Sequence, residues 1–313
     1  MSEAELQQIT DGKDAKSTNN STKYAVKTFR IYFKDKQLPE DFENRTKQEL
    51  DSRLCCFYAE VRNTHGEMYK RISLLSVRSN IGRYLSKTLS IDITKDNEFN
   101  SSNDIFSSMC IFTVKKGKGV VVHKDGIEHS DIRKRYMSMV FCVATQTGLL
   151  NKVWFELCLH FCRWGRENQR ELMPQMFALE SDNLGKRYIH QVSSEVTKKH
   201  QELSSTDTNG KSVHMYETGT DNCPVKSFLK YLSKRHSQCE SLFQRPKDSF
   251  NEDDETWYEK RPLGKNKLGN MMSELSRAAT LSKNYTIHCI RATAISTLDR
   301  AGYEARHIMT VSY

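Results

Sequence analysis

The sequence predicts a mainly α-helical protein with a small antiparallel β-sheet, in which a helical domain is followed by an α+β domain. Three observations lead to this class. Apolar residues recur every three or four positions along most of the chain, as they do in amphipathic helices. One segment near residue 190 alternates instead with the period of two that is typical of a strand. The length of 313 residues allows two domains with separate cores.

Four amphipathic helices are predicted in the N-terminal part of the chain. The first is indicated by an apolar stripe of Val26, Phe29 and Phe33. Thr46 and Glu49 have the spacing of a capping box, which places the start of the second helix. Further stripes mark the body of this helix and the two that follow: Leu50, Leu54, Phe57, Tyr58 and Val61; Leu74, Val77, Ile81, Tyr84 and Leu85; Ile105, Met109 and Phe112. We expect these helices to form one domain over residues 23–116, after a polar and disordered lead at residues 1–22.

A basic run that contains glycine, Lys115-Lys116-Gly117-Lys118-Gly119, interrupts the helical pattern. We therefore place a linker at residues 117–130 and a second domain at residues 131–313. The first helix of this second domain is indicated by the stripe Val153, Trp154, Leu157 and Phe161.

A β-hairpin is predicted after this helix. An alternating segment carries Tyr188, His190, Val192, Ser194 and Val196 on one side, and residues 213–216 form its short partner strand. Three more helices are indicated by apolar groups: Phe228, Leu229 and Leu232; Leu268, Met271, Met272 and Leu275; and residues 287–298. Gly302 is expected to end the last of these helices.

The charge balance favours an anionic partner. The chain contains 48 Lys and Arg against 39 Asp and Glu, which gives a formal net charge of +9. Nucleic acid is a better candidate than a membrane surface, although a solvated positive face would give the same count. No run approaches the roughly 20 apolar residues of a membrane span, and the mean hydropathy is −0.68. We expect no membrane association.

The cysteines indicate a reducing compartment. Nine cysteines without paired spacing are expected to be thiols, and the N-terminus has no apolar core of a secretory signal. An intracellular location, nuclear or cytoplasmic, follows. Cys158, His160 and Cys162 form the most ligand-like cluster, but no second pair has zinc-finger spacing. We therefore expect buried thiols there, and neither a metal nor a cofactor in this protein.

The strongest chemical signal is a His-x-x-Arg motif near the C-terminus. His288 and Arg291 are three residues apart, so in a helix an imidazole and a guanidinium share one face and can converge on one phosphate. The spacing alone means little, because His160 and Arg163 show the same pattern. Context separates the two pairs. Thr293 and Ala294 follow Arg291, and Ala301-Gly302 breaks the helix before a second one begins.

This segment resembles the late signature of tyrosine recombinases. Other segments resemble the crypton-derived branch of that family, which is shared with the C-terminal domains of zinc-finger MYM-type and glutamine-rich host proteins. They are Phe161-Cys162-Arg163-Trp164-Gly165-Arg166-Glu167-Asn168, Thr220-Asp221-Asn222-Cys223-Pro224-Val225, Leu242-Phe243-Gln244-Arg245-Pro246 and Pro262-Leu263-Gly264-Lys265-Asn266. Together they span most of residues 23–313.

The resemblance implies a helical core-binding (SAM-like) domain followed by a tyrosine-recombinase catalytic domain. It implies DNA recombination or integration, an origin in a transposon, double-stranded DNA as the partner, and a homo-oligomer assembled on that DNA. Basic residues would then contact backbone phosphates. The candidates for these contacts are Arg71, Arg78, Arg83, Lys115, Lys116, Lys118, Arg163 and Lys199.

The family's chemistry also suggests roles for particular residues. Arg166 and Arg291 would bind the non-bridging oxygens of the phosphate, with Arg163 and Arg170 as alternatives for the first. His288 would assist proton transfer from the nucleophile. Lys198, or else Lys199, would protonate the leaving oxygen.

The sequence departs from the family pattern after the last helix. The pattern continues with Ser-Gly-His and a helix that carries the nucleophilic tyrosine, whereas this chain reads Val311-Ser312-Tyr313. We expect no strand cleavage, because covalent catalysis without its nucleophile has no reaction path. Tyr313 is not expected to replace it, since a terminal residue does not hold the attack geometry. Two alternatives stay open: an active recombinase, if the true product extends past residue 313, and a non-catalytic scaffolding module in chromatin or transcription.

Overall fold

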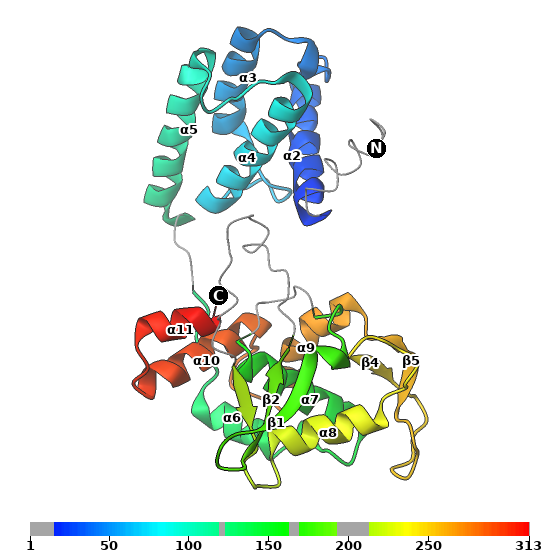
Figure 1. The fold of residues 1–313 in the computed structure, drawn as a ribbon. Coiled ribbons are helices and arrows are strands. Elements are labelled where there is room, and N and C mark those ends of the chain that lie inside the picture. Colours follow the sequence, from blue (N-terminus) through cyan, green and yellow to red (C-terminus); the bar gives the residue numbers. More distant parts are fainter. Residues whose placement is uncertain (1–15, 119–122, 163–168, 193–212, 313) are drawn as a thin grey trace. The chain divides into compact units, whose positions relative to one another are not determined.

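The computed structural model describes residues 16–118, 123–162, 169–192 and 213–312. The chain divides into two compact units, residues 1–122 and 123–313, and each has its own hydrophobic core. Unit 1 is helical, and unit 2 combines helices with small antiparallel sheets (Figure 1). The predicted fold class is therefore confirmed. The division lies inside the 117–130 segment to which we assign the linker.

The described part of unit 1 contains four α-helices that pack side by side (Figure 1), and the residues of their apolar stripes form one core. Their bounds are α2 (Lys16–Asp35), α3 (Lys47–Glu60), α4 (Arg71–Leu89) and α5 (Asn100–Thr113). The main contacts pair α2 with α4 and α3 with α5. Phe29 is fully buried at the centre, with its ring centroid 4.9 Å from that of Phe33 and 4.8 Å from that of Phe57. Edge-on aromatic contacts of this kind add to the gain from burying apolar area.

The predicted capping box at the start of α3 is present. The hydroxyl of Thr46 accepts a hydrogen bond from the backbone N–H of Glu49 (3.3 Å), and the Glu49 carboxylate accepts one from the backbone N–H of Thr46 (2.9 Å). Two donors that the helix itself cannot satisfy are thus paired.

The expected disorder of residues 1–22 is wrong for residues 16–22, because α2 begins at Lys16. Polar rather than apolar contacts hold this turn against α4. The Thr22 hydroxyl donates to the side-chain oxygen of Asn80 (3.1 Å) and accepts from Arg83 (3.4 Å). An apolar stripe therefore does not mark the start of this helix.

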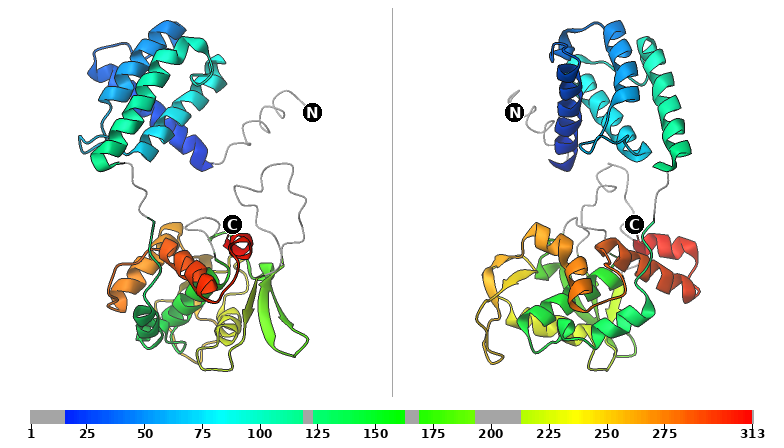
Figure 2. Two further views of the ribbon diagram at one scale, coloured as in Figure 1. Left: turned by 90° about the vertical axis from the view of Figure 1, so that its left-hand side faces the viewer. Right: turned by 180° about the vertical axis from the view of Figure 1, so that it is seen from behind.

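Unit 2 is organised around α7 (Gln146–His160), which is buried along most of its length. Three helices pack against it: α8 (Pro224–Lys234), α9 (Lys265–Ala278) and α10 (Ile287–Arg300). Figure 2 shows α10 and the following helix α11 (Ala305–Ser312) from two further sides. Gly302 lies between them with a positive φ of 81°, which confirms it as the stop.

The helix α6 (His129–Tyr136) was not expected, and it includes the last two residues of the predicted linker. The buried side chains of this helix include the charged residues Asp131 and Arg135. Its sequence therefore shows no apolar stripe that would predict a helix. No helix in the described ranges is long and apolar enough to cross a membrane.

The described residues of unit 2 also form two antiparallel sheets. The larger sheet contains β1 (Phe177–Ser181), β2 (Arg187–Gln191) and β3 (His214–Tyr216) in that order, with His190 opposite Ala178 on one side and His214 on the other. The predicted hairpin is the β2–β3 pair, and its expected residues Ser194 and Val196 lie outside the described residues. Strand β1 was not predicted, nor was the two-stranded sheet of β4 (Gln244–Pro246) and β5 (Tyr258–Pro262).

Candidate anion-binding site

The start of α10 positions both residues of the His-x-x-Arg motif. Thr286 precedes the helix, and its backbone N–H donates to the Cys289 sulfur (3.5 Å). His288 lies in the first turn and is exposed, and Arg291 follows one turn later and is half-buried. The first turn of a helix also carries the positive end of the helix dipole. The two side chains and the backbone therefore all favour an anion here.

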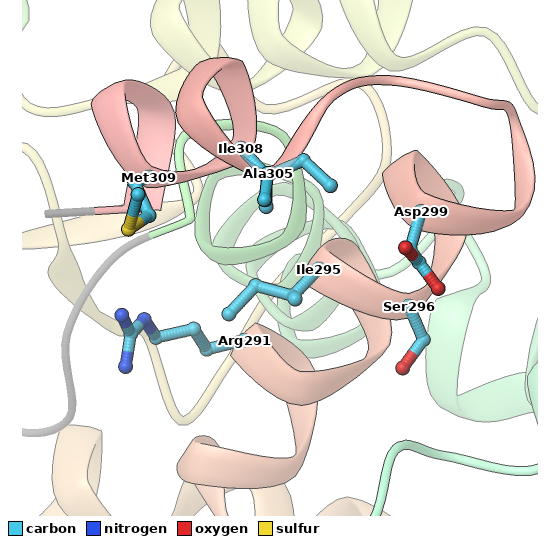
Figure 3. A pocket seen from close by; sticks show the side chains of 7 residues that line it. All are labelled: Arg291, Ile295, Ser296, Asp299, Ala305, Ile308 and Met309. Atoms are coloured by element: carbon cyan, nitrogen blue, oxygen red, sulfur yellow. The ribbon is translucent and has the colours of Figure 1, made fainter.

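Arg291 lies at one end of an open groove between α10 and α11 (Figure 3). The groove has a volume of about 380 Å³. Its other lining residues are Ile295, Ser296 and Asp299 from α10 and Ala305, Ile308 and Met309 from α11. In Figure 3 the guanidinium lies near Met309, whereas Asp299 lies toward the other end. The groove is thus positive at the end where α10 begins.

The end of α7 lies close to Arg291. Cys162 follows α7 with a left-handed backbone (φ 47°) and is buried. Burial raises the pKa of its thiol, and the charge of Arg291 opposes this rise, so the two side chains are electrostatic neighbours. The next residues in the sequence, 163–168, carry Arg163 and Arg166.

Several predicted site residues lie outside the described part of the chain. These are Arg163, Arg166, Lys198, Lys199 and Tyr313. Of the predicted set of four, the structure describes only His288 and Arg291. Arg170, the alternative to Arg166, is exposed.

A hydrogen-bonded anchor fixes the chain just before α10. The Asp131 carboxylate accepts bonds from the backbone N–H of Ser282 (3.1 Å) and from the hydroxyl of Tyr285 (2.8 Å). Burial alone would raise the pKa of Asp131, but the hydrogen bonds from Ser282 and Tyr285 lower it below its ordinary value. Asp131 is therefore held as a carboxylate, and α6 is tied to the entry of α10. No local sequence pattern marks this anchor, because its partners are more than 150 positions apart.

In unit 1, some of the predicted DNA-binding residues gather at one end. Arg71 begins α4 and interacts with Cys110 near the end of α5, and Lys118 binds the Glu67 carboxylate (3.4 Å) just before α4. Lys115 and Lys116 lie between Cys110 and Lys118 in the sequence, and both are exposed. The start of α4 and the end of α5 thus form a basic end, which we define as Arg71, Lys115, Lys116 and Lys118.

The other two predicted arginines of unit 1 lie elsewhere. The Arg78 guanidinium packs over the Phe106 ring, 4.4 Å from its centroid, and hydrogen-bonds to Asn103. This contact ties α4 to α5. Arg83 is exposed and donates to the Asn80 side chain (2.6 Å), about 18 Å along the helix from Arg71 at 1.5 Å per residue. The structure therefore does not gather all six predicted residues of this unit.

The outer face of the larger sheet carries a cluster that the sequence did not indicate as a site. The Tyr188 and His214 rings stack with centroids 4.0 Å apart. The Glu180 carboxylate accepts a bond from the Tyr188 hydroxyl (2.9 Å) and lies 3.2 Å from the His190 imidazole. In the ranges that the structure describes, no group of three His, Cys, Asp or Glu side chains is arranged to hold a metal ion.

Large pKa shifts of charged side chains occur in the core of unit 2. Burial raises the pKa of Glu156 to about 7, although Lys152 opposes the rise with an ion pair one helical turn away. Burial also lowers the pKa of Arg135, which lies over the Phe155 ring, to about 10. These groups are enclosed in the core. We assign them to the fold rather than to a reaction.

The comparisons with known proteins cover different parts of the chain. Residues 136–277 match the family described as a domain of unknown function, DUF3504. No curated protein matches. Among solved structures, the XerA recombinase is similar at 11% sequence identity with a TM-score of 0.37, over 93% of this chain and 88% of that one.

Proposed function

We propose that this chain is a DNA-binding protein of the tyrosine-recombinase type, with crypton ancestry, that holds a backbone phosphate of duplex DNA at the start of α10. One observation carries the proposal. His288 and Arg291, the two motif residues that the structure describes, lie in successive turns at the start of one helix, and Arg291 borders an open groove. The sequence segments quoted above support the family, and we further propose a nuclear location and assembly of several copies on DNA.

The chemistry of the site fits a phosphate better than a base. A guanidinium can donate two parallel hydrogen bonds to the oxygens of one phosphate, and an exposed imidazole one turn earlier on the same helix can donate a third. The basic end of unit 1 would bind further phosphates. Phosphate contacts give affinity that depends on salt but little on base sequence.

The test measures binding of a fluorescent DNA duplex to the full chain at several salt concentrations. We expect Arg291→Ala to weaken binding by about 1–3 kcal/mol and to lower the slope of log affinity against log salt by about 0.9. Arg300→Ala is the matched control, because Arg300 is an exposed arginine at the opposite end of α10. Equal affinities for wild type and both variants would contradict a phosphate role for Arg291. Affinity that does not change with salt would favour the scaffolding alternative.

A nicked suicide duplex tests the cleavage step in the same preparation. Binding without a protein–DNA adduct would agree with a chain that holds DNA without cleaving it. An adduct on Tyr313 would overturn the expectation that the chain does not cleave DNA.

A further inference from the structure

The first residues of unit 2 cross α10 one turn beyond the candidate site. We call residues 123–128 the strap. The backbone N–H of Ile127 donates to the Thr293 hydroxyl (2.7 Å), and that hydroxyl donates in turn to the Cys289 carbonyl of its own helix (2.7 Å). Both Ile127 and Thr293 are buried. The Thr293 hydroxyl thus joins the strap to the turn that carries Arg291.

The strap lies against α10 too closely for a larger residue at its contact point. A Cβ atom on Gly126 would lie 3.3 Å from the Cα of Thr293 and 3.4 Å from its backbone nitrogen. Few side chains tolerate such distances from a backbone, so glycine permits this approach. Steric fit and the hydrogen bond therefore locate the strap at the same residue.

A second attachment lies on the other side of the site. The backbone N–H of Glu128 points to the Tyr285 hydroxyl (3.4 Å), and the Glu128 carboxylate pairs with Lys283 (2.7 Å). Tyr285 precedes the turns with His288 and Arg291, whereas Thr293 follows them. The strap therefore holds the site-bearing turns of α10 from both ends.

Breaking the hydrogen bond between Ile127 and Thr293 is also energetically unfavourable. A buried backbone N–H that loses its acceptor is unfavourable, because no water replaces the partner. The strap and α10 consequently keep one relative position. Displacements of about 1 Å in a binding or catalytic group are enough to reduce its effect strongly.

We infer that the strap is a positioning element for the phosphate site, and that Thr293 is a positioning residue that acts through Arg291. This inference rests on the proposed function. The Thr293 hydroxyl does not line the groove; it sets where the Arg291 guanidinium lies by fixing the helix against the strap.

The experiment compares duplex affinity, salt slope and thermal unfolding of three single variants in the full chain. Thr293→Val keeps the side-chain volume but removes the hydroxyl, Thr293→Ser restores the hydroxyl, and Thr297→Val is the control. The Thr297 hydroxyl donates to the Thr293 carbonyl within α10 (2.8 Å), so its removal leaves the strap in place. We expect Thr293→Val to weaken binding on the order of threefold to tenfold, and the other two variants to bind like wild type.

A double-mutant cycle with Arg291→Ala separates positioning from a general effect on folding. We expect Thr293→Val to cause no further loss of affinity once Arg291 is absent. An equal loss in both backgrounds would overturn the inference. So would a Thr293→Val variant that binds like wild type while Arg291→Ala binds weakly. If Arg291→Ala itself has no effect, the proposed function fails, and the inference fails with it.

Gly126→Ala provides a second perturbation if Thr293→Val does not fold. The added methyl group presses on the Thr293 backbone and shifts the strap without removing any hydrogen-bonding group. We expect Gly126→Ala to weaken DNA binding when Arg291 is present, and to leave the affinity unchanged when it is combined with Arg291→Ala. Wild-type affinity for Gly126→Ala would contradict a positioning role for the strap.

Discussion

His160 lies at the end of α7, and its imidazole is partly buried near the positive charge of Lys152. Burial lowers the pKa of His160 to about 4, and Lys152 lowers it further. The ring is therefore neutral near pH 7. The other His-x-x-Arg pair of the sequence, His160 and Arg163, thus differs from the pair on α10, whose histidine is exposed. At the residue scale, environment rather than spacing distinguishes the two motifs.

The pKa of His160 predicts an acid-sensitive contribution to stability. An unfolded histidine takes up a proton near pH 6.5, whereas the folded one does so only near pH 4. Between these values the unfolded state binds more protons, so the free energy of unfolding falls as the pH is lowered through this window, by at most about 3 kcal/mol. We expect His160→Gln to lose less stability than wild type between pH 7 and pH 4.5 in urea unfolding. His129→Gln, which changes an exposed histidine of unit 2, should follow wild type; equal losses for wild type and His160→Gln would refute the assignment.

At the scale of single elements, helices with an apolar stripe and a cap could be predicted from the sequence. The start of α3 is the clearest case, since both bonds of its capping box are present. Elements without an apolar stripe or a cap could not be predicted from the sequence. Strand β1 has only Phe177 buried, so its strand conformation depends on pairing with β2. Helix α6 buries charged side chains, and a hydrophobic pattern does not report them.

The capping box gives a prediction at this scale. Thr46→Ala removes the acceptor of the Glu49 N–H and should lower the free energy of unfolding by about 1 kcal/mol. Thr88→Ala is the control, because the Thr88 hydroxyl binds only to the Tyr84 carbonyl of its own helix (2.7 Å) in the structure. Denaturant unfolding monitored by circular dichroism measures both variants. A larger loss for Thr88→Ala than for Thr46→Ala would show that the cap does not stabilise α3.

The candidate site could be predicted only in its local part. His288 and Arg291 are recognisable because their spacing and context lie within one short segment of sequence. The Ile127–Thr293 and Asp131–Tyr285 contacts join residues 166 and 154 positions apart, and no local pattern marks them. Periodicity reports which face of a helix is buried, but it does not report which other segment covers that face.

For the whole molecule, the two units provide separate sets of cations. The basic end lies in unit 1, and His288 and Arg291 lie in unit 2. If both units bind the same duplex, phosphate contacts in different units should contribute independently. The salt dependence of the whole chain then reports the number of contacts in both.

This arrangement predicts additive effects of two distant arginines. Arg71→Ala and Arg291→Ala should each lower the slope of log affinity against log salt by about 0.9, and the double variant should lower it by about twice that amount. Arg78→Ala is the control within unit 1. Because Arg78 packs on Phe106, its loss should lower the thermal stability of unit 1 and leave the slope unchanged. A double variant no weaker than either single variant would argue against simultaneous binding by both units.

The ring cluster on the outer face of the larger sheet provides a built-in spectroscopic reporter. His190 and His214 lie opposite each other on β2 and β3, the two strands that residues 193–212 connect in sequence. We expect the stacked Tyr188 ring to shift the imidazole proton resonances of His214, and both histidines can be followed by NMR without attaching a label. A DNA-induced change in the β2–β3 pair would therefore become visible as a chemical-shift change at these two histidines.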